Sequence, residues 1–378
     1  MTDIKQQSLK LHAKLKGKIR IQATCDIETN EDLTLIYSPG VGAVSEAIAA
    51  DPSKVDELTW RKNAVAIFSD GSAVLGLGDI GPLAALPVLE GKCAIFKRFS
   101  NIDAVPIILN TKDVDAIVET IVNIAPSFGA IQLEDISAPR CFEIERRLME
   151  RLDMPVMHDD QHGTAIVILA GLINALAVVN KKMEEIKVVM NGAGAAGIAA
   201  ARLLDVAGVR NLIMCDRKGA IYAGREGLNE EKIMAASFTN LDKRAGSLAE
   251  MAVGADVLIG VSVAGAFTVE IVKSMAKDPI VFALANPVPE ILPEVAKEAG
   301  VAVLATGRSD YPNQVNNALC YPGLFRGMLD TGIKRVTDET KLRAAEAIAA
   351  AVSKPTAENI IPSIFAPGLH ELVAKNVV

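Results

Sequence analysis

The chain contains few of the residues that mark secreted, zinc-binding or nucleic-acid-binding proteins. It has five cysteines, an odd number, and no two of them form a Cys-x-x-Cys pair. This usage excludes a disulfide framework and a zinc-thiolate site, and it indicates a reducing compartment. An excess of positive charge is also missing. The net charge is -7, which argues against nucleic acid or an anionic membrane as a partner.

The sequence also lacks a segment that reads as a signal peptide or a membrane span. Its N-terminus is rich in lysine and has no apolar core. The most apolar stretch, Ala165–Val179, contains Gly171 and Asn174 and is short for a bilayer span. We therefore expect a cytoplasmic protein in which this stretch is a buried helix that links two domains.

What is present is the pattern of an α/β protein. Half of the residues are hydrophobic and only 4% are aromatic, and 378 residues are enough for two domains with a full core each. Alternation of strand-like and helix-like segments predicts parallel sheets with helices on both faces. We expect one domain at residues 1–160 and a second at 161–378, whose helical end, including Leu342–Val352, packs back on the first. Strands are expected at Ala64–Phe68, Lys92–Phe96, Val105–Leu109, Ile186–Met190, Asn211–Cys215, Val257–Gly260, Ile280–Ala283 and Val301–Leu304.

A glycine fingerprint in the middle of the chain predicts a dinucleotide site. Gly192, Gly194 and Gly197 follow the expected strand Ile186–Met190 and precede a helical run. In a Rossmann fold these glycines allow the turn, the approach of the pyrophosphate and close helix packing, and the helix N-terminus attracts the phosphates. The positions expected to bind the cofactor are Thr164, Gly192, Gly194, Ala195, Ala196, Gly197, Ile198, Asp216 and Asn286.

The choice between NAD and NADP depends on Asp216, nineteen residues after Gly197. A carboxylate there can hold both ribose hydroxyls of NAD and repels the extra phosphate of NADP. Arg217 and Lys218 follow at once, and either can turn inward to bind that phosphate. We expect NAD, with NADP as the alternative.

Carboxylates gather at two further points. Glu134 and Asp135 follow an expected strand, and Asp159 and Asp160 lie just before the apolar helix. Three such oxygen ligands suit Mg²⁺ or Mn²⁺, although a solvated acidic loop is the alternative. We expect the neighbouring His158 and His162 to be local hydrogen-bond partners and not metal ligands.

Four other residues are candidates for substrate chemistry. Lys92 is expected at the start of an apolar strand, where desolvation would lower its pKa and make it a base; a solvated strand-end lysine is the alternative. Tyr37 lies in a turn-rich segment and is either a fixed phenol or a buried structural residue. Asn286 and Asn317 follow strands and are either substrate ligands or turn residues.

Taken together, these motifs resemble the malic enzyme family in its short bacterial form. They occur in order over nearly the whole chain and are Tyr37-Ser38-Pro39-Gly40-Val41-Gly42, Gly76-Leu77-Gly78-Asp79-Ile80-Gly81, Gly91-Lys92, Glu134-Asp135, Asp159-Asp160-Gln161-His162-Gly163-Thr164, the glycine fingerprint, Ala285-Asn286-Pro287, and Asn316-Asn317 with Tyr321-Pro322-Gly323. The resemblance implies a malic-type α/β domain followed by a Rossmann domain. It also implies oxidative decarboxylation of L-malate to pyruvate and CO₂ with NAD(P)⁺ and a divalent cation.

The resemblance implies a role for each candidate. Glu134, Asp135 and Asp160 would bind Mg²⁺ or Mn²⁺, which would hold malate and polarise its C2 carbonyl after oxidation. Lys92 would be the general base on the C2 hydroxyl, and Tyr37 would protonate C3 of enolpyruvate. Asp159 would tune Lys92 or the metal. Asn286, Asn317 and Lys92 would contact the substrate, and the enzyme would be a homodimer or a higher homo-oligomer.

One departure and three rival functions remain. Longer family members place a carboxylate-binding arginine where this chain has Ala73, so the ligand of the distal carboxylate is open. A malolactic enzyme uses the same motifs and releases lactate. A metal-independent amino-acid dehydrogenase would leave the three carboxylates unexplained, and a nucleotide-sensing module would not need the filled catalytic positions.

Overall fold

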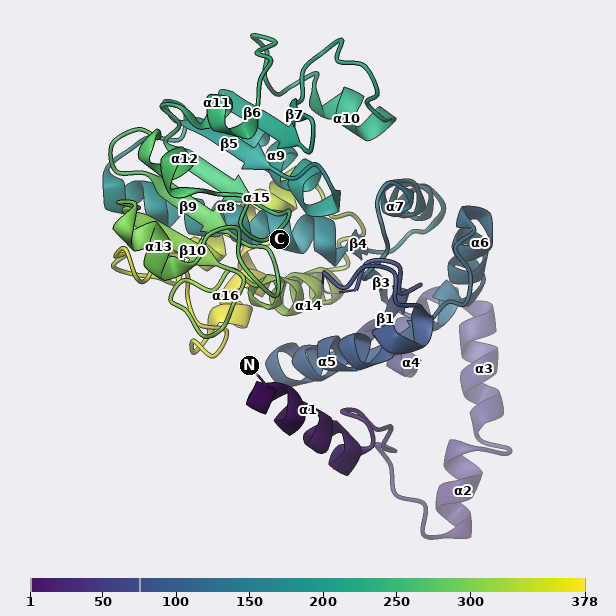
Figure 1. Cartoon of the computed structure of the whole chain (residues 1–378). Helices are drawn as coiled ribbons and strands as arrows, with labels where there is room; N and C mark the ends of the chain where they lie inside the picture. Colours follow the sequence, from purple (N-terminus) through teal and green to yellow (C-terminus); the bar gives the residue numbers. More distant parts are fainter. Residues whose placement is uncertain (1, 75, 378) are drawn as a thin grey trace.

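Two parallel sheets, each covered by helices, form the body of the protein (Figure 1). The computed structural model describes residues 2–74 and 76–377. The first sheet has the order β2-β1-β3-β4, and the second has the order β10-β9-β8-β5-β6-β7, in which only the edge strand β7 is antiparallel. The strands are β1 (Ala64–Ser69), β2 (Asp103–Ile108), β3 (Ala130–Leu133), β4 (Val156–His158), β5 (Lys187–Asn191), β6 (Asn211–Asp216), β7 (Gly219–Ala220), β8 (Val257–Gly260), β9 (Ile280–Ala283) and β10 (Val303–Thr306). The predicted α/β class with a Rossmann-type second sheet is confirmed.

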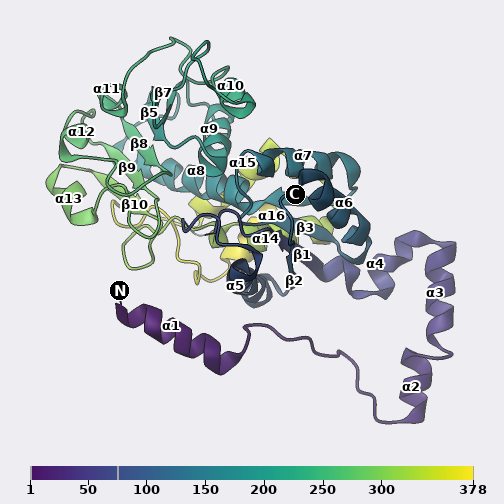
Figure 2. The same ribbon diagram turned by 45° about the vertical axis from the view of Figure 1, so that its right-hand side comes forward.

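Helices occupy most of the remaining chain. The longest, α8, runs between the two sheets (Figures 1 and 2). The helices are α1 (Thr2–Leu15), α2 (Asn30–Ile36), α3 (Val41–Ala50), α4 (Val55–Leu58), α5 (Pro82–Ser100), α6 (Val114–Ile124), α7 (Arg140–Arg151), α8 (Asp159–Val179), α9 (Ala195–Val206), α10 (Glu230–Ala235), α11 (Leu248–Ala252), α12 (Val269–Lys273), α13 (Pro293–Glu298), α14 (Tyr321–Thr331), α15 (Asp338–Ala350) and α16 (Leu369–Asn376).

Lys92–Phe96 is helical, and the prediction of a strand there is wrong. The segment belongs to α5, which begins at Pro82, a residue preorganised for the first helical turn. Its buried residues include Ala85, Leu89, Lys92 and Phe96, which repeat at helical spacing. A run of five mostly apolar residues does not distinguish a strand from a buried helix, and only the longer 3.6-residue period does. Lys92 therefore lies on the buried face of a helix and not at a strand end.

The other expected strands exist, with small shifts. β1, β5, β6, β8 and β9 match the expected segments to within a residue at each end, and β2 begins two residues earlier than expected. The strand expected at Val301–Leu304 begins two residues later, because Val301 is still bonded to the end of α13. Strand ends depend on hydrogen bonds that a propensity pattern does not contain.

The apolar segment before the glycine fingerprint forms the buried helix that we expected. α8 begins at Asp159 and crosses the predicted boundary at residues 160/161, which stays a prediction. α15, which covers most of Leu342–Val352, packs mainly on α8 and also on α9. The contacts with the first domain come from α14 and α16, which pack on α5.

The N-terminal segment extends away from both sheets (Figures 1 and 2). No residue of α2 or α3 is buried, although Asn30–Ala50 is apolar, with a mean hydropathy of 1.3 over its most apolar window. By length and composition alone, this segment and α8 are the two candidates for a membrane span in the described chain. α8 meets that criterion as a core helix, since 67% of its most apolar window is buried.

Candidate active site

Three carboxylates meet where the first sheet ends. β3 pairs in parallel with β4, so the residues that follow them, Glu134-Asp135 and Asp160, lie at the same edge of the sheet. One oxygen from each of the three side chains lies within 4.8 Å of the others. Glu134 and Asp135 are buried and Asp160 is partly exposed. Burying like charges together is costly without a counter-ion, so this donor set fits a divalent cation such as Mg²⁺ or Mn²⁺.

Asp160 is held in place from two sides. Its Oδ2 accepts a hydrogen bond from the Asp135 backbone nitrogen at 2.8 Å and lies 3.1 Å from Nε2 of His158. Burial alone would raise the pKa of Asp160, but the hydrogen bond and charge of His158 outweigh it and hold the pKa below its ordinary value. The carboxylate is therefore kept in the ionised form that a metal requires. The contact agrees with the prediction that His158 is a local hydrogen-bond partner and not a metal ligand.

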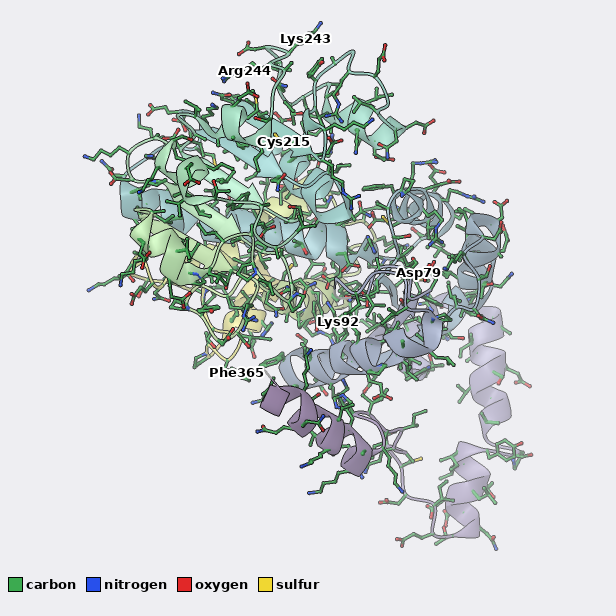
Figure 3. All side chains as sticks on the ribbon, viewed as in Figure 1. Asp79, Lys92, Cys215, Lys243, Arg244 and Phe365 are labelled. Atoms are coloured by element: carbon green, nitrogen blue, oxygen red, sulfur yellow. The ribbon has the colours of Figure 1, made fainter. Side chains whose placement is uncertain are left out.

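Lys92 lies on α5, where Figure 3 labels it, and its ion pairs with Glu134 and Asp159 bring it into the same cluster. Its Nζ lies 2.5 Å from Asp159 Oδ2 and 3.0 Å from Glu134 Oε1. Burial by itself would lower the pKa of Lys92, as we expected from the sequence, but the two carboxylates reverse the effect and raise the pKa well above its ordinary value. That expectation is wrong because it took account of the apolar surroundings only. Burial raises the pKa of Asp159, against the opposing charge of Lys92.

Tyr321, to which the sequence assigned no role, lies against Lys92. It is the first residue of α14 and is completely buried. The Lys92 ammonium lies 4.7 Å from the centre of its ring. The turn from Asn317 to Tyr321 therefore places an aromatic ring next to the lysine ammonium. This contact is visible only in the folded chain.

The glycine loop has the geometry of a dinucleotide site. A Cβ on Gly197 would lie 2.0 Å from the carbonyl oxygen of Gly192, so this position requires glycine for helix packing. A Cβ on Gly194 would meet nothing within 4 Å, which leaves open space in front of the N-terminus of α9. Ala195 and Ala196 form the first turn of that helix, with Ile198 buried behind them. The open position and the helix N-terminus fit a pyrophosphate.

Asp216 lies at the end of β6 but is already paired. Arg225 donates to both of its carboxylate oxygens, and Lys232 Nζ lies 2.8 Å from Oδ2. Burial would raise its pKa, but the hydrogen bonds from Arg225 and Lys232 outweigh burial and hold the pKa well below its ordinary value. Arg225 and Lys232 thus neutralise Asp216, and binding of a 2′-phosphate by the adjacent Arg217 or Lys218 stays a prediction.

The remaining polar candidates lie on three different segments of the chain. Asn317 lies beside the start of α8, where its Cβ approaches Gly163. Asn286 is exposed after β9, and its backbone carbonyl approaches Gly76 of the first domain. Thr164 is partly buried on the first turns of α8. Ala73 donates its backbone N–H to the Asp135 carbonyl at 3.0 Å, so the loop that lacks the arginine borders the carboxylate cluster.

Arg140 contacts that loop directly. Its guanidinium lies 2.8 Å from Asp70 Oδ2 and donates to the hydroxyls of Ser72 and Ser137. These contacts use it to fix the loop. The side chain of Arg140 is therefore committed to holding this loop.

Tyr37 does not lie with the other candidates. It follows α2 on the N-terminal segment that extends away from both sheets (Figures 1 and 2). The side chain is exposed, with 66% of the residue's surface accessible. The alternative of a buried structural tyrosine is wrong. Within one chain, the catalytic set that the sequence predicts is therefore incomplete.

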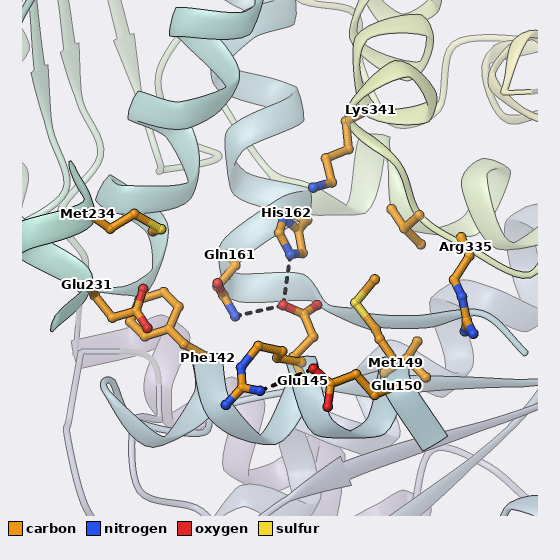
Figure 4. A pocket seen from close by; sticks show the side chains of 13 residues that line it. Phe142, Glu145, Met149, Glu150, Gln161, His162, Glu231, Met234, Arg335 and Lys341 are labelled. Atoms are coloured by element: carbon orange, nitrogen blue, oxygen red, sulfur yellow. Dashed lines mark hydrogen bonds and ion pairs between the residues drawn. The ribbon is translucent and has the colours of Figure 1, made fainter. Parts of the chain in front are cut away.

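A cavity of about 530 Å³ lies between α7, α10 and the start of α15 (Figure 4). Glu145 of α7 forms part of its wall and accepts hydrogen bonds from the His158 backbone nitrogen, Gln161 and His162, at 2.6, 3.1 and 2.9 Å. Through His158 this network reaches Asp160. Both histidines thus have hydrogen-bond partners and neither belongs to the cluster of three carboxylates.

Comparison with known proteins gives a consistent result. Residues 161–372 match the family model described as the malic enzyme NAD-binding domain, and residues 16–113 and 110–149 match the malic enzyme N-terminal domain. The chain is 54% identical over 379 aligned residues to the bifunctional malic/malolactic enzyme of Bacillus subtilis, covering 98% of this chain and 92% of that protein. It is 56% identical to the NAD-dependent malic enzyme of Geobacillus stearothermophilus, over 96% of this chain and 76% of that protein.

Solved structures agree over the whole chain. The crystal structure of the NAD-dependent malic enzyme of Thermotoga maritima superposes with a TM-score of 0.95 at 47% identity, over 98% of both chains. That of the Entamoeba histolytica malic enzyme superposes with a TM-score of 0.95 at 41% identity, over 99% of this chain and 80% of that one. Since the family models and relatives cover nearly all of the chain in both domains, the protein belongs to the malic enzyme family.

Proposed function

We propose that the protein oxidises L-malate to pyruvate and CO₂ with reduction of a nicotinamide cofactor. The observation that carries this proposal is the position of Lys92 in the carboxylate cluster, in a chain whose second sheet bears the open glycine loop. The test is NAD(P)⁺ reduction with L-malate, with and without Mn²⁺, together with identification of the product. No reduction of either cofactor in the presence of malate and Mn²⁺ would reject the proposal.

Glu134, Asp135 and Asp160 would hold Mg²⁺ or Mn²⁺. When bound, the cation would supply a Lewis acid that orients malate and stabilises negative charge on its C2 oxygen. The protein's part is to keep these three carboxylates ionised and oriented, as His158 does for Asp160. An amino-acid dehydrogenase would give these three residues no such task.

Lys92 and Asp159 would act together as the base. The two groups are 2.5 Å apart, and the pKa values of both are raised, Lys92 by its carboxylate partners and Asp159 by burial. The Lys92 ammonium would pass a proton to Asp159 Oδ2 and take up the proton of the C2 hydroxyl while hydride leaves C2 for the nicotinamide, so that Asp159 ends protonated and Lys92 remains an ammonium. The resulting β-keto acid loses CO₂, and the enol carbon C3 then needs a proton. Asn286 and Asn317 would orient the substrate and the nicotinamide.

The proton donor for C3 would be Tyr37 of a second copy of this chain. In one chain Tyr37 is exposed, and the helices on either side of it bury no residue. The same segment exposes the apolar side chains of Leu33, Leu35 and Val41, an unusual amount for a free surface. A homodimer that covers this segment and brings Tyr37 to the partner's Lys92 cluster would explain both facts.

For the cofactor we propose NAD, with Asp216 as the ribose ligand. Arg225 and Lys232 neutralise this carboxylate, which reduces its repulsion of a 2′-phosphate. They therefore set how strongly NADP is excluded, and the ratio of kcat/KM for the two cofactors measures it. We further propose that the protein works in the cytoplasm.

A second candidate is the malolactic reaction, in which malate yields lactate with no net cofactor reduction. It is favoured by the name of the 54% identical relative, a bifunctional malic/malolactic enzyme. The product assay separates the two reactions, because lactate without net NADH would indicate the malolactic reaction.

A further inference from the structure

One buried titratable residue next to the reacting groups has no part in the reaction described above. Tyr321 is completely buried, and burial together with the charges of Asp159 and Glu134 raises the pKa of its phenol well above the ordinary value, against the opposing charge of Lys92. Its hydroxyl oxygen is buried and has no hydrogen-bond partner among the described residues. The hydroxyl of a buried tyrosine normally has a hydrogen-bond partner, and without one it does not stabilise the fold. The reason for an aromatic residue at this position is therefore its ring.

The ring of Tyr321 has two contacts that matter. Its face lies 4.7 Å from the ammonium of Lys92, within the range of a cation–π interaction. Its other contact is a T-shaped pair with Phe96, with centroids 4.7 Å apart. Phe96 lies one turn after Lys92 on the buried side of α5, so helix α5 and the start of α14 together fix the ring.

Lys92 needs such a contact because its two carboxylate partners restrict the position of its Nζ only partly. Asp159 and Glu134 each bind Nζ. A lysine has a flexible four-carbon side chain with many rotamers. Because its ammonium is a compact charge without a preferred direction, two ion pairs alone do not fix the position of Nζ. The Tyr321 ring lies 4.7 Å from Nζ as a third neighbour and restricts where Nζ can lie.

We propose that Tyr321 is a positioning residue for Lys92, and that the aromatic ring and not the hydroxyl performs this task. The ring face holds the Lys92 ammonium beside Asp159, where it can relay the proton of the C2 hydroxyl. The assignment rests on the proposed role of Lys92 in malate oxidation.

Two substitutions at position 321 separate the ring from the hydroxyl. Tyr321→Phe keeps the ring and removes an unpaired buried hydroxyl, so malate oxidation should stay within about threefold of wild type, with thermal stability equal or higher. Tyr321→Leu removes the ring, and kcat for malate oxidation should fall by roughly 10- to 30-fold with little change in KM, the size expected for a desolvated cation–π contact.

Phe325 provides the matched control. It lies one turn further along α14, is also completely buried, and also forms a T-shaped pair with Phe96, at 5.5 Å. Phe325→Leu removes a similar ring from the same cluster while leaving the Lys92 contact in place. It should lower thermal stability like Tyr321→Leu and leave kcat close to wild type. Equal losses of kcat in the two leucine variants would overturn the proposal, since both would then act through general packing.

A spectroscopic measurement tests the contact without any catalytic assay. Protons on the ε-carbon of a lysine that lies over an aromatic face resonate upfield, and the Lys92 signal is assigned by its loss in Lys92→Arg. The upfield shift should persist in Tyr321→Phe and Phe325→Leu and disappear in Tyr321→Leu. An unshifted Lys92 signal in the wild-type protein would overturn the proposal even if malate is oxidised. A protein that shows the shift but does not oxidise malate would instead reject the proposed function alone.

Equal loss of kcat in Tyr321→Phe and Tyr321→Leu would also overturn the inference, because the hydroxyl would then be the functional group. A kinetic split adds a check that packing would not produce. Tyr321→Leu should slow malate oxidation more than decarboxylation of supplied oxaloacetate, since only the first needs Lys92 to take the hydroxyl proton.

Discussion

Two inactive variants should restore activity to each other when they are mixed. The variants are Tyr37→Phe and Lys92→Ala, each with a defect in a different half of the proposed site. In the described chain, Lys92 is buried in the carboxylate cluster while Tyr37 is exposed on a segment that buries no residue. If each site combines Lys92 of one chain with Tyr37 of the other, a heterodimer has one site with both defects and one site with none.

The expected recovery of activity follows from the fraction of heterodimers and the number of intact sites in each. Random re-association gives about half heterodimers, each with one intact site of two, so the mixture should recover roughly a quarter of wild-type activity. Heterodimers purified through two different tags should recover roughly half. The assay is NADH formation from saturating malate and Mn²⁺ after the variants are co-expressed, with each homodimer measured alone.

The control mixes two variants whose defects lie in residues that the same chain contributes to a site. Lys92 and Asp160 both belong to the carboxylate cluster of one chain. Lys92→Ala mixed with Asp160→Asn should therefore give no recovery, because each site of the heterodimer keeps one defect. Purified Tyr37→Phe/Lys92→Ala heterodimers that remain inactive would refute a shared site.

Other predictions concern the metal, the glycine loop and the cofactor. Asp160→Asn should weaken Mn²⁺ binding and lower kcat by orders of magnitude while nucleotide affinity, measured by fluorescence titration, stays near wild type; full wild-type activity in excess chelator would contradict the metal site. Gly197→Ala should destabilise the protein in thermal unfolding, because its Cβ would lie 2.0 Å from a backbone oxygen. Lys232→Ala should lower kcat/KM for NADP more than for NAD, and an equal effect on both would remove Lys232 from cofactor selection. Because the pKa of Asp216 is depressed in the folded protein, its stabilising contribution is fully present above its unfolded pKa of about 4 and is lost as the pH falls through the lower folded value. Asp216→Asn should therefore reduce the free energy of unfolding at pH 7 more than at pH 3.

The sequence determined most of the second domain. The strand before Gly192, the glycine spacing and the helix after it are local features, and the structure reproduces them at β5 and α9. Requirements such as the close approach of Gly197 to Gly192 act over a few residues, so a short pattern contains them. The ordered motifs also determined the family.

The sequence decided less about the first domain. Lys92–Phe96 looks like a strand over five residues, and only the longer α5, with its buried face set by Leu89, Lys92 and Phe96, makes it a helix. The pKa of Lys92 is raised, whereas the sequence predicted that it is lowered. The prediction missed Asp159, because this residue lies 67 positions away in the chain and reaches Nζ only through the tertiary fold.

Long-range pairing explains the other differences in the same way. Arg225 and Lys232 neutralise Asp216 from nine and sixteen positions away, and no short pattern announces that contact. Tyr321 meets Lys92 only because α14 packs on α5. The sequence by itself determined which chemical groups are present and the local backbone that carries them. The tertiary structure decided which groups share a site and what charge each one meets, because electrostatic contacts depend on distance in space and not along the chain.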